Sequence, residues 1–499
     1  MGIKSFLAKP YASFLVKTMR KLHENPAEAQ KEIFHNLIQQ ASQTQFGKDH
    51  QFVEITSHQE FVKKVPIRDY EQLRPYIDQI VEGKPDVLWP GKPAYFCKTS
   101  GTTSGAKYIP LSKESVPDHI HAAKMAMLCY IDETGKSQYL DGKMMFLQGS
   151  PEMSDKNGIP VGRLSGITAH WVPNYLQKNR LPSWETNCID DWETKVDAVV
   201  DETTPADMRL ISGIPSWVQM YFEKVLEKTG KATIAEVFPN FSLFIYGGLN
   251  YEPYRPIFKK LMGKDIPAVE TFPASEGFIA YQDSQKKPGL LLNLEAGIFY
   301  EFVPVDEIHN ENPTRLTVSE VEVGVNYALI LNTNSGLWGY NIGDTVKFVS
   351  TNPHRLIVSG RIKHFISAFG EHVIAEEVES TMKEVMDLFH VQVREFHLAP
   401  QVNPAEGELP YHEWFVEFEQ KPANMDAMRM RMDLLMQEKN PYYKDLIQGN
   451  ILQPLRVTSI ERDGFQKMMK SRGKLGGQNK IPRLANDCTL ADLLADYKL

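Results

Sequence analysis

The segment Lys98–Ser112 reads KTSGTTSGAKYIPLS, and it concentrates glycines, hydroxyl residues and a lysine in one short stretch. Glycines let the backbone turn its amide N–H groups toward an anion, and hydroxyl and ammonium groups add further donors. The side chains that could hold the phosphates of a nucleotide in this way are those of Ser100, Thr102, Thr103, Ser104 and Lys107. The segment therefore predicts a triphosphate-binding loop.

The spacing in this segment differs from that of a P-loop. In a P-loop the lysine directly follows the second glycine and is itself followed by serine or threonine. Here Gly101 and Gly105 are closer together, Ala106 separates Gly105 from Lys107, and Tyr108 comes next. A loop rich in Gly, Ser and Thr is, taken alone, more often an ordinary loop. The phosphate interpretation therefore depends on the rest of the chain.

Two carboxylates later in the chain supply that context. The stretch TFPASEGFIA places Glu276 after an apolar strand, where ligands gather in α/β sheets and where a carboxylate can hold Mg²⁺ beside phosphates. The stretch GYNIGDTVKF predicts a β-turn at Asp344, whose carboxylate could accept hydrogen bonds from a ribose diol. Each has an ordinary alternative, because Glu276 could be a surface residue or helix cap and Asp344 a plain turn residue.

Length and composition narrow the class of protein. A chain of 499 residues is too long for one ordinary core, which predicts at least two domains. A net charge of −8 argues against a protein that grips the nucleic-acid backbone. The four cysteines form no CxxC pair, and no apolar run is long enough to span a membrane. These features predict a cytoplasmic protein with no membrane span, and Cys97 is expected to be a buried apolar thiol.

The order of predicted elements indicates an α/β fold. Helices and strands alternate as far as about residue 280, and a β-rich block follows. The turn-rich stretch GRIKHFISAFGEHV then leads to a helix, two strands, a helix, a strand and a helix. We expect a large N-terminal α/β domain with a β subdomain over residues 1–373, and a smaller mobile α/β domain over residues 374–499.

Taken in this order, the motifs resemble those of the acyl-adenylate-forming enzymes, and more closely those of the Gretchen Hagen family of acyl acid–amido synthetases. The opening loop is similar to the family's S-S-G-T-S-x-G, and VPIRDYEQLRPYIDQIVEGKPDVLWPGKP is similar to the segment that precedes it there. FPASE, YNIGD and GGQNKIPR stand where the family has Y-x-S-S-E, Y-R-x-G-D and N-Q-Y-K-x-P-R. The last motif is specific to this branch.

The resemblance implies ATP and Mg²⁺ as cofactors and assigns roles along the chain. Lys107, Glu276 and Lys480 would be catalytic, with Glu276 also holding the metal and Lys480 entering from the mobile domain. The resemblance implies nucleotide binding by Ser100, Thr102, Thr103, Tyr246, Gly247, Gly248, Ser275, Asp344 and Arg361. Of these, Tyr246 to Gly248 would lie beside adenine, and Asp344 would hold the ribose. The stretch 360–373 would be the hinge.

Some positions depart from the family pattern. Phe272 replaces a tyrosine, Asn341 replaces an arginine, and Lys363 stands at the hinge position that is often aspartate in the wider superfamily. Lys474 is a rival for the mobile-domain lysine, because SRGK loosely matches the superfamily's terminal glycine–lysine pair. The Q-x-K-x-P-R spacing favours Lys480.

The function implied is activation of a carboxylic acid as its acyl-adenylate, followed by transfer to an amine, with an amino acid as the expected acceptor. The alternatives are an acyl-CoA ligase that uses the same adenylate, and a nucleotide-binding protein without turnover. Aromatic residues between the loop and the glycine pair could line the acyl pocket, although each could equally be core: Trp171, Tyr175, Trp217 and Tyr221. His170 could bind a carboxylate, but a structural histidine is the commoner case. The acid, the amine and the oligomeric state are not determined by these motifs.

Overall fold

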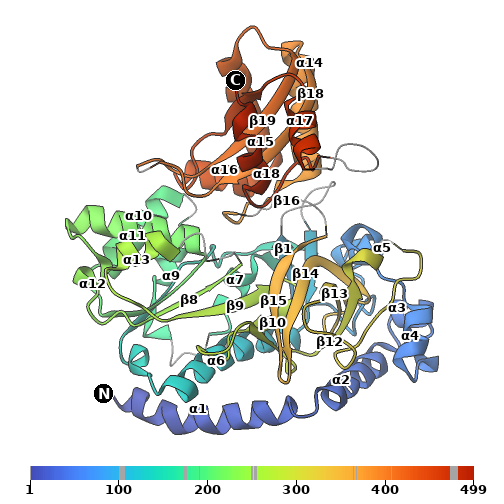
Figure 1. The fold of residues 1–499 in the computed structure, drawn as a ribbon. Helices are drawn as coiled ribbons and strands as arrows, with labels where there is room; N and C mark the ends of the chain where they lie inside the picture. The colour runs from blue at the N-terminus through green and yellow to red at the C-terminus, as the bar shows by residue number, and fades with distance from the viewer. Residues whose placement is uncertain are drawn as a thin grey trace. The chain divides into compact units, whose positions relative to one another are not determined.

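The structure is a computed structural model, shown in Figure 1. It describes residues 2–99, 107–172, 177–189, 192–248, 251, 255–308, 310–362, 365–366, 368–371, 373–405, 407–472 and 481–499. The described chain separates into two compact units, the first ending at Ile362 and the second formed mainly by the residues that follow. The predicted boundary at residue 373 lies a few residues beyond this division and stays a prediction.

An eleven-stranded sheet forms the centre of unit 1, in the order β12-β13-β14-β15-β11-β10-β9-β8-β7-β3-β6. Its strands are β3 (Lys143–Phe146), β6 (Arg180–Leu181), β7 (Met208–Ser212), β8 (Leu243–Gly247), β9 (Ala268–Ala274), β10 (Gly277–Tyr281), β11 (Leu290–Leu292), β12 (Ile298–Pro304), β13 (Asn326–Thr333), β14 (Tyr340–Thr351) and β15 (His354–Arg361). Strands β6, β3, β7, β8 and β9 pair parallel with one another, and the pairs from β9–β10 to β12–β13 are antiparallel. The predicted β subdomain is thus continuous with the α/β sheet.

A smaller sheet of unit 1 carries the end of the predicted phosphate loop. Its order is β2-β1-β5-β4. The strands are β1 (Tyr95–Thr99), β2 (Lys107–Leu111), β4 (Ser154–Lys156) and β5 (Ile159–Gly162). β1 and β2 are antiparallel, with Thr99 opposite Lys107. The residues between them, 100–106, lie outside the described part of the chain.

Helices of unit 1 surround the sheets (Figure 1). They are α1 (Ile3–Leu22), α2 (Pro26–Ala41), α3 (Gln45–Asp49), η1 (Phe52–Glu54), α4 (His58–Lys64), α5 (Tyr70–Val81), α6 (Ser115–Thr134), η2 (Gln138–Asp141), α7 (Leu164–Ala169), α9 (Trp184–Asn187), α10 (Trp192–Thr203), α11 (Pro215–Thr229), α12 (Ile234–Val237), α13 (Arg255–Met262) and η4 (Val305–Glu307). The start of α5 follows from its sequence, because Asp69 and Gln72 form a reciprocal capping box. Helix α1 packs along α6 at the edge of the unit.

Unit 2 has the order of elements that the sequence predicts. Its elements are β16 (Phe365–Ile366), β17 (Val373–Ile374), α14 (Ala375–Phe389), β18 (Gln392–Gln401), β19 (Tyr411–Gln420), α15 (Met425–Lys439), α16 (Pro441–Gln448), β20 (Arg456–Ile460), α17 (Gly464–Ser471), α18 (Thr489–Leu493) and η5 (Ala495–Tyr497). The sheet order is β18-β19-β20, with the last pair parallel. The short helix α16 was not predicted, and its start is set by Asn440, whose side chain accepts from the Tyr443 amide.

Candidate active site

The parallel strands of unit 1 end at one edge of the main sheet. Because β7, β8 and β9 run in the same direction, the residues that follow them meet there. Tyr246 and Gly247 end β8, Gly248 follows, and Ser275 and Glu276 come directly after β9. The sequence therefore brings two of its predicted nucleotide-binding segments to the same place.

The glycine pair is required by its surroundings. A Cβ atom on Gly247 would lie 2.5 Å from the carbonyl oxygen of Thr271, which is too close for any other residue. Gly248 has φ +80°, a left-handed conformation that side chains disfavour. Tyr246 is buried, and its hydroxyl donates to Glu270 at 3.3 Å. Its ring also lies beside Phe244, at 5.5 Å between centroids.

Ser275 and Glu276 form the two-residue turn of a hairpin, since Ala274 pairs with Gly277. The sequence predicts a strand followed by a loop here, and the loop is only this turn. The Cys97 thiol of β1 donates to the Ser275 hydroxyl at 3.0 Å, which ties the small sheet to the turn. Burial raises the pKa of Cys97 to about 12, so the thiol stays protonated and is not a nucleophile. The expectation of a buried thiol is confirmed.

A buried tyrosine connects Glu276 to the start of β14. The Tyr340 hydroxyl donates to Glu276 Oε1 at 3.4 Å. Burial, aided by the Glu276 carboxylate, raises the pKa of Tyr340 well above its ordinary value, so the phenol remains a donor. Tyr70 on α5 lies beside the start of β2, because its hydroxyl accepts the Tyr108 amide at 2.8 Å and the Lys107 ammonium lies 5.5 Å from its ring centroid.

Asp344 does not lie on a β-turn, as the sequence predicts, but inside strand β14. The four steps from Asn341 to Thr345 correspond to only two steps along β13, so the residues between them form a bulge. Gly343 makes this possible with φ +88°. The strand continues through the bulge because β15 pairs on its other side, where Asp344 lies opposite Arg361. The Asp344 side chain is mostly buried.

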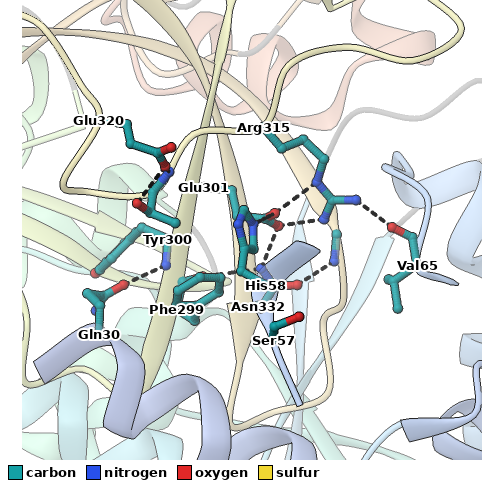
Figure 2. Close-up of polar contacts among 12 residues, drawn as sticks. Gln30, Ser57, His58, Val65, Phe299, Tyr300, Glu301, Arg315, Glu320 and Asn332 are labelled. Atoms are coloured by element: carbon teal, nitrogen blue, oxygen red, sulfur yellow. Dashed lines mark hydrogen bonds and ion pairs between the residues drawn. The ribbon is translucent and has the colours of Figure 1, made fainter. Parts of the chain in front are cut away.

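A buried charged network supports the segment before Tyr340 (Figure 2). The Glu301 carboxylate accepts from Arg315 at 2.8 and 2.6 Å, from His58 at 2.7 Å and from the Asn332 amide at 2.9 Å. The side-chain oxygen Oδ1 of Asn332 in turn accepts from the backbone N–H of Gly339 at 2.7 Å. Since Gly339 directly precedes Tyr340, this network fixes the chain at the start of the YNIGD motif.

Several predicted site residues cannot be compared with the structure. Ser100, Thr102, Thr103, Lys474 and Lys480 lie outside the described residues. For Arg361 the backbone is described, in β15, but the side chain is not.

The aromatic residues proposed for an acyl pocket have mixed outcomes. Tyr221 does not line an open pocket, because it is wholly buried and its hydroxyl is 2.6 Å from that of Thr203. His170 is exposed, with its Nε2 2.9 Å from the Pro151 carbonyl oxygen, and its structural role stays a prediction. Trp171 donates to the Tyr95 hydroxyl at 3.2 Å and is partly exposed. Tyr175 lies outside the described residues, and the acyl pocket stays a prediction.

The Glu276 carboxylate, at the edge of the main sheet where the parallel strands end, suits a magnesium ion whose other ligands come from a nucleotide. Among the described residues, no three His, Cys, Asp or Glu side chains gather as a self-contained metal site. Mg²⁺ typically takes only one or two protein carboxylates when substrate phosphates supply the remaining ligands. Glu276 meets this requirement, because it lies on a half-buried turn beside the Tyr340 hydroxyl donor.

Comparison with known proteins identifies the family. The GH3 family N-terminal domain matches residues 15–199, the GH3 central domain residues 291–361, and the GH3 C-terminal domain residues 376–489. The chain belongs to the GH3 family, the Gretchen Hagen family that its motifs resemble. The division between the central and C-terminal domains falls in the stretch predicted as a hinge.

Curated relatives of this GH3 protein are amido synthetases. Indole-3-acetic acid-amido synthetase GH3.3 of Arabidopsis thaliana is 20% identical over 569 residues, covering 96% of this chain and 93% of the relative. The jasmonoyl–L-amino acid synthetase JAR4 of Nicotiana attenuata is 21% identical over 402 residues, covering 67% and 68%. The predicted enzyme class, an acid–amido synthetase that works through an acyl-adenylate, is thereby confirmed.

Solved structures share the predicted fold. The acyl acid amido synthetase GH3.15 of Arabidopsis thaliana, solved with 2,4-DB, has a TM-score of 0.62 at 16% identity and covers 97% of this chain and 96% of its own. A 2-hydroxyisobutyryl-CoA ligase has a TM-score of 0.59 at 13% identity, with coverages of 92% and 90%. Both share the fold of adenylate-forming enzymes, so the predicted fold class is confirmed.

Two site residues were missed in the sequence. Tyr340 opens the YNIGD motif, and Tyr70 lies in the segment before the phosphate loop. Their motif positions were visible, but their contacts to Glu276 and Lys107 depend on strand pairing between distant segments.

Proposed function

We propose that this GH3 protein activates a carboxylic acid with ATP and Mg²⁺ and joins it to an amino acid. The observation that carries the proposal is the contact between Tyr340 and Glu276, which joins two predicted ATP-site motifs at the edge where parallel strands end. The tyrosine would hold the Glu276 carboxylate in position for a metal.

The first step joins two anions. A carboxylate oxygen of the acid attacks the α-phosphorus of ATP, the bond to the β-phosphate oxygen breaks, and pyrophosphate leaves. Bound Mg²⁺ would offset phosphate charge and orient the leaving group. We assign the phosphates to Lys107 and the loop hydroxyls of Ser100, Thr102 and Thr103, and the metal to Glu276.

The nucleoside is assigned to the neighbouring strands. Asp344, on the β14 bulge, would accept from the ribose hydroxyls, and Arg361 opposite it in the ladder would neutralise nearby charge. The glycine pair beside Tyr246 would form the flat wall beside adenine, since Gly247 has no room for a side chain. Ser275 would face the α-phosphate from the hairpin turn.

The second step makes the amide. The amine nitrogen attacks the carbonyl carbon of the acyl-adenylate, a proton leaves the nitrogen, and the bond to AMP breaks. Lys480 would stabilise the negative charge during adenylation, and the C-terminal domain would turn about the stretch 360–373 between the two steps. The acceptor is assigned as an amino acid because the relative JAR4 is named a jasmonoyl–L-amino acid synthetase.

Pyrophosphate release tests this proposal. We would measure it with ATP and Mg²⁺ over aryl, indolyl and fatty acids, with and without an amino acid mixture, for wild type and Lys107→Met. Release that requires an acid and accelerates with amino acids is expected in wild type, with a loss of about a hundredfold in the variant. ATP binding without release for any acid would contradict the proposal and favour a binding protein.

The fold of the 2-hydroxyisobutyryl-CoA ligase keeps one alternative open. A CoA ligase makes the same adenylate and passes the acyl group to a thiol. Acceleration of pyrophosphate release by CoA alone, and not by any amino acid, would assign this chain to that activity.

A further inference from the structure

Helix α1 of unit 1 has an outward face that is apolar. Phe6, Leu7, Tyr11 and Phe14 are 67, 59, 50 and 69% exposed, although all are large hydrophobic residues. Successive members are one, four and three positions apart, which places them on neighbouring turns of one side of the helix. Isolated exposed apolar residues are ordinary, but a continuous row of aromatic side chains on one helix face marks an interaction surface.

The opposite side of α1 holds the helix to the protein. Ala12, Val16 and Met19 are buried and pack with residues of α6, including Met125 and Cys129. Ser5 is also buried on this side, and its hydroxyl donates to the Ser137 carbonyl oxygen at 2.8 Å. The helix is therefore already anchored, and its exposed row is not needed for that anchoring. Figure 1 shows α1 at the edge of the unit, beside α6.

The charge on α1 has one sign. Residues 3–22 contain no Asp or Glu and five basic residues, whereas the whole chain has a net charge of −8. Lys4 contacts Asn179 at 3.0 Å and Arg20 contacts Asp132 at 3.0 Å. Lys17 and Lys21 are exposed and continue the outward face beyond Phe14 at helical spacing.

We propose that this outward face of α1 docks on an anionic lipid surface. Exposed Phe, Leu and Tyr side chains would enter the boundary between headgroups and acyl chains, and Lys17 and Lys21 would contact lipid phosphates. The helix would lie in the plane of the membrane. No helix in the described part of the chain has the length and apolar character of a membrane span, so attachment is to the surface.

The positive charge of α1 favours an anionic lipid surface over a second copy of this chain as the partner. A symmetric dimer through α1 would bring two helices of the same positive charge together, which like-charge repulsion opposes. An anionic bilayer satisfies both properties of the face at once, because it accepts apolar side chains and attracts cations.

Vesicle binding tests the proposal with the full chain. We would measure sedimentation with phosphatidylcholine vesicles, with and without phosphatidylglycerol, for wild type, Phe6→Ser/Phe14→Ser and Lys17→Gln/Lys21→Gln. Wild type is expected to bind the anionic vesicles, and the aromatic variant to lose that binding. Removing two cations should weaken binding to anionic vesicles about 30-fold and leave neutral vesicles unaffected.

A control variant tests whether vesicle binding depends on the outward face of α1 or on any exposed apolar residue. Val53 and Val323 are 71 and 57% exposed and lie outside α1, so Val53→Ser/Val323→Ser should bind vesicles as wild type does. Unchanged melting temperatures for all variants would show that they fold. Wild type that fails to bind anionic vesicles, or aromatic variants that bind equally, would overturn the proposal. A dimer in solution that the aromatic variant dissociates would assign the face to a second copy instead.

Discussion

At the scale of single residues, Glu276 and Tyr340 form the contact on which the proposed metal site depends. Glu276 lies on a two-residue turn, and the hydrogen bond from the buried Tyr340 phenol restricts the rotation of its carboxylate. This contact could not be predicted from the sequence, because it joins β10's turn to a strand more than sixty positions later in the chain.

Replacing Glu276 tests its role directly. Glu276→Gln keeps the shape but removes the negative charge, so we expect adenylation to slow by about a hundredfold and the Mg²⁺ requirement to rise. Pyrophosphate release at a series of Mg²⁺ concentrations measures both. Tyr340→Phe is the matched control, and its loss should be smaller, about tenfold. Equal Mg²⁺ dependence in Glu276→Gln and wild type would place the metal elsewhere.

The Glu301 network predicts a pH dependence of stability. Burial alone would raise the pKa of Glu301, but Arg315 and His58 outweigh it and lower the pKa from 4.5 to about 2. Because the pKa is lower in the folded state, the ionised carboxylate stabilises the fold above pH 4.5. That contribution, roughly 3 kcal/mol, is lost as the pH falls from 4.5 toward 2. Urea unfolding across this pH range measures it.

Variants of the network provide the comparison. Glu301→Gln should lose about 3 to 5 kcal/mol of unfolding free energy at pH 7, since Arg315 keeps a buried charge without its partner. Its stability should also change less between pH 4.5 and 2 than that of wild type. Glu301→Leu/Arg315→Met removes both charges and should recover part of the loss. Identical pH profiles for wild type and Glu301→Gln would exclude Glu301 as the titrating group.

At the scale of elements, strand β14 differs most from its prediction. A glycine followed by aspartate is a common turn signal, and the sequence predicts a turn there. The structure instead keeps an uninterrupted strand, because β13 and β15 pair with β14 on both sides and the extra residues form a bulge. Local turn preference is overridden by pairing with distant strands, which a single sequence does not reveal.

We expect the β14 bulge at Gly343 to affect the affinity for ATP. Gly343 has φ +88° and open space where a Cβ would lie, and Gly91, in the segment before β1, has φ +77° and is equally open. Gly343→Ala and Gly91→Ala should therefore each lose about 1 to 2 kcal/mol of stability. Only Gly343→Ala should also weaken ATP binding, because it re-aims Asp344. Calorimetric titration with ATP compares them, and equal affinities would separate the bulge from the nucleotide site.

Other elements were predictable from local signals. Asp69 caps α5 as its sequence indicates, and the strand and helix around the Gly-Pro turn at residues 213–215 appear as β7 and α11. Such elements have their signals within a few residues. The loop predicted after β9 is a two-residue turn at Ser275 and Glu276, and its length depends on the pairing between β9 and β10.

At the scale of the whole molecule, the order of motifs predicted the family, the fold class and the enzyme class, all of which are confirmed. The order of motifs can be recognised even where overall sequence identity to the relatives is low, because each motif serves one step of the same chemistry. The roles of individual residues, the acid, the amine and the predicted cytoplasmic location stay predictions. They depend on pocket shape and cellular context, which the motifs do not determine.

Because the chain forms two units, we expect a substitution at Lys480 to change the rate of adenylation without changing the affinity for ATP. Lys480→Ala should slow adenylation by about a hundredfold while ATP affinity, which we assign mainly to residues before the hinge, remains close to that of wild type. Lys474→Ala is the matched control, with a small effect on both. ATP titration and pyrophosphate release measure the two quantities. A severe loss in Lys474→Ala with normal Lys480→Ala would move the role to Lys474.

The central claim is that the adenylate is passed to an amino acid. The most direct measurement is mass spectrometry of the product formed from ATP, Mg²⁺ and an acid that supports pyrophosphate release, with amino acids and CoA offered together. We predict an acid–amino acid amide, with AMP and pyrophosphate in equal amounts. A CoA thioester without any amide, or AMP release without either product, would contradict the claim.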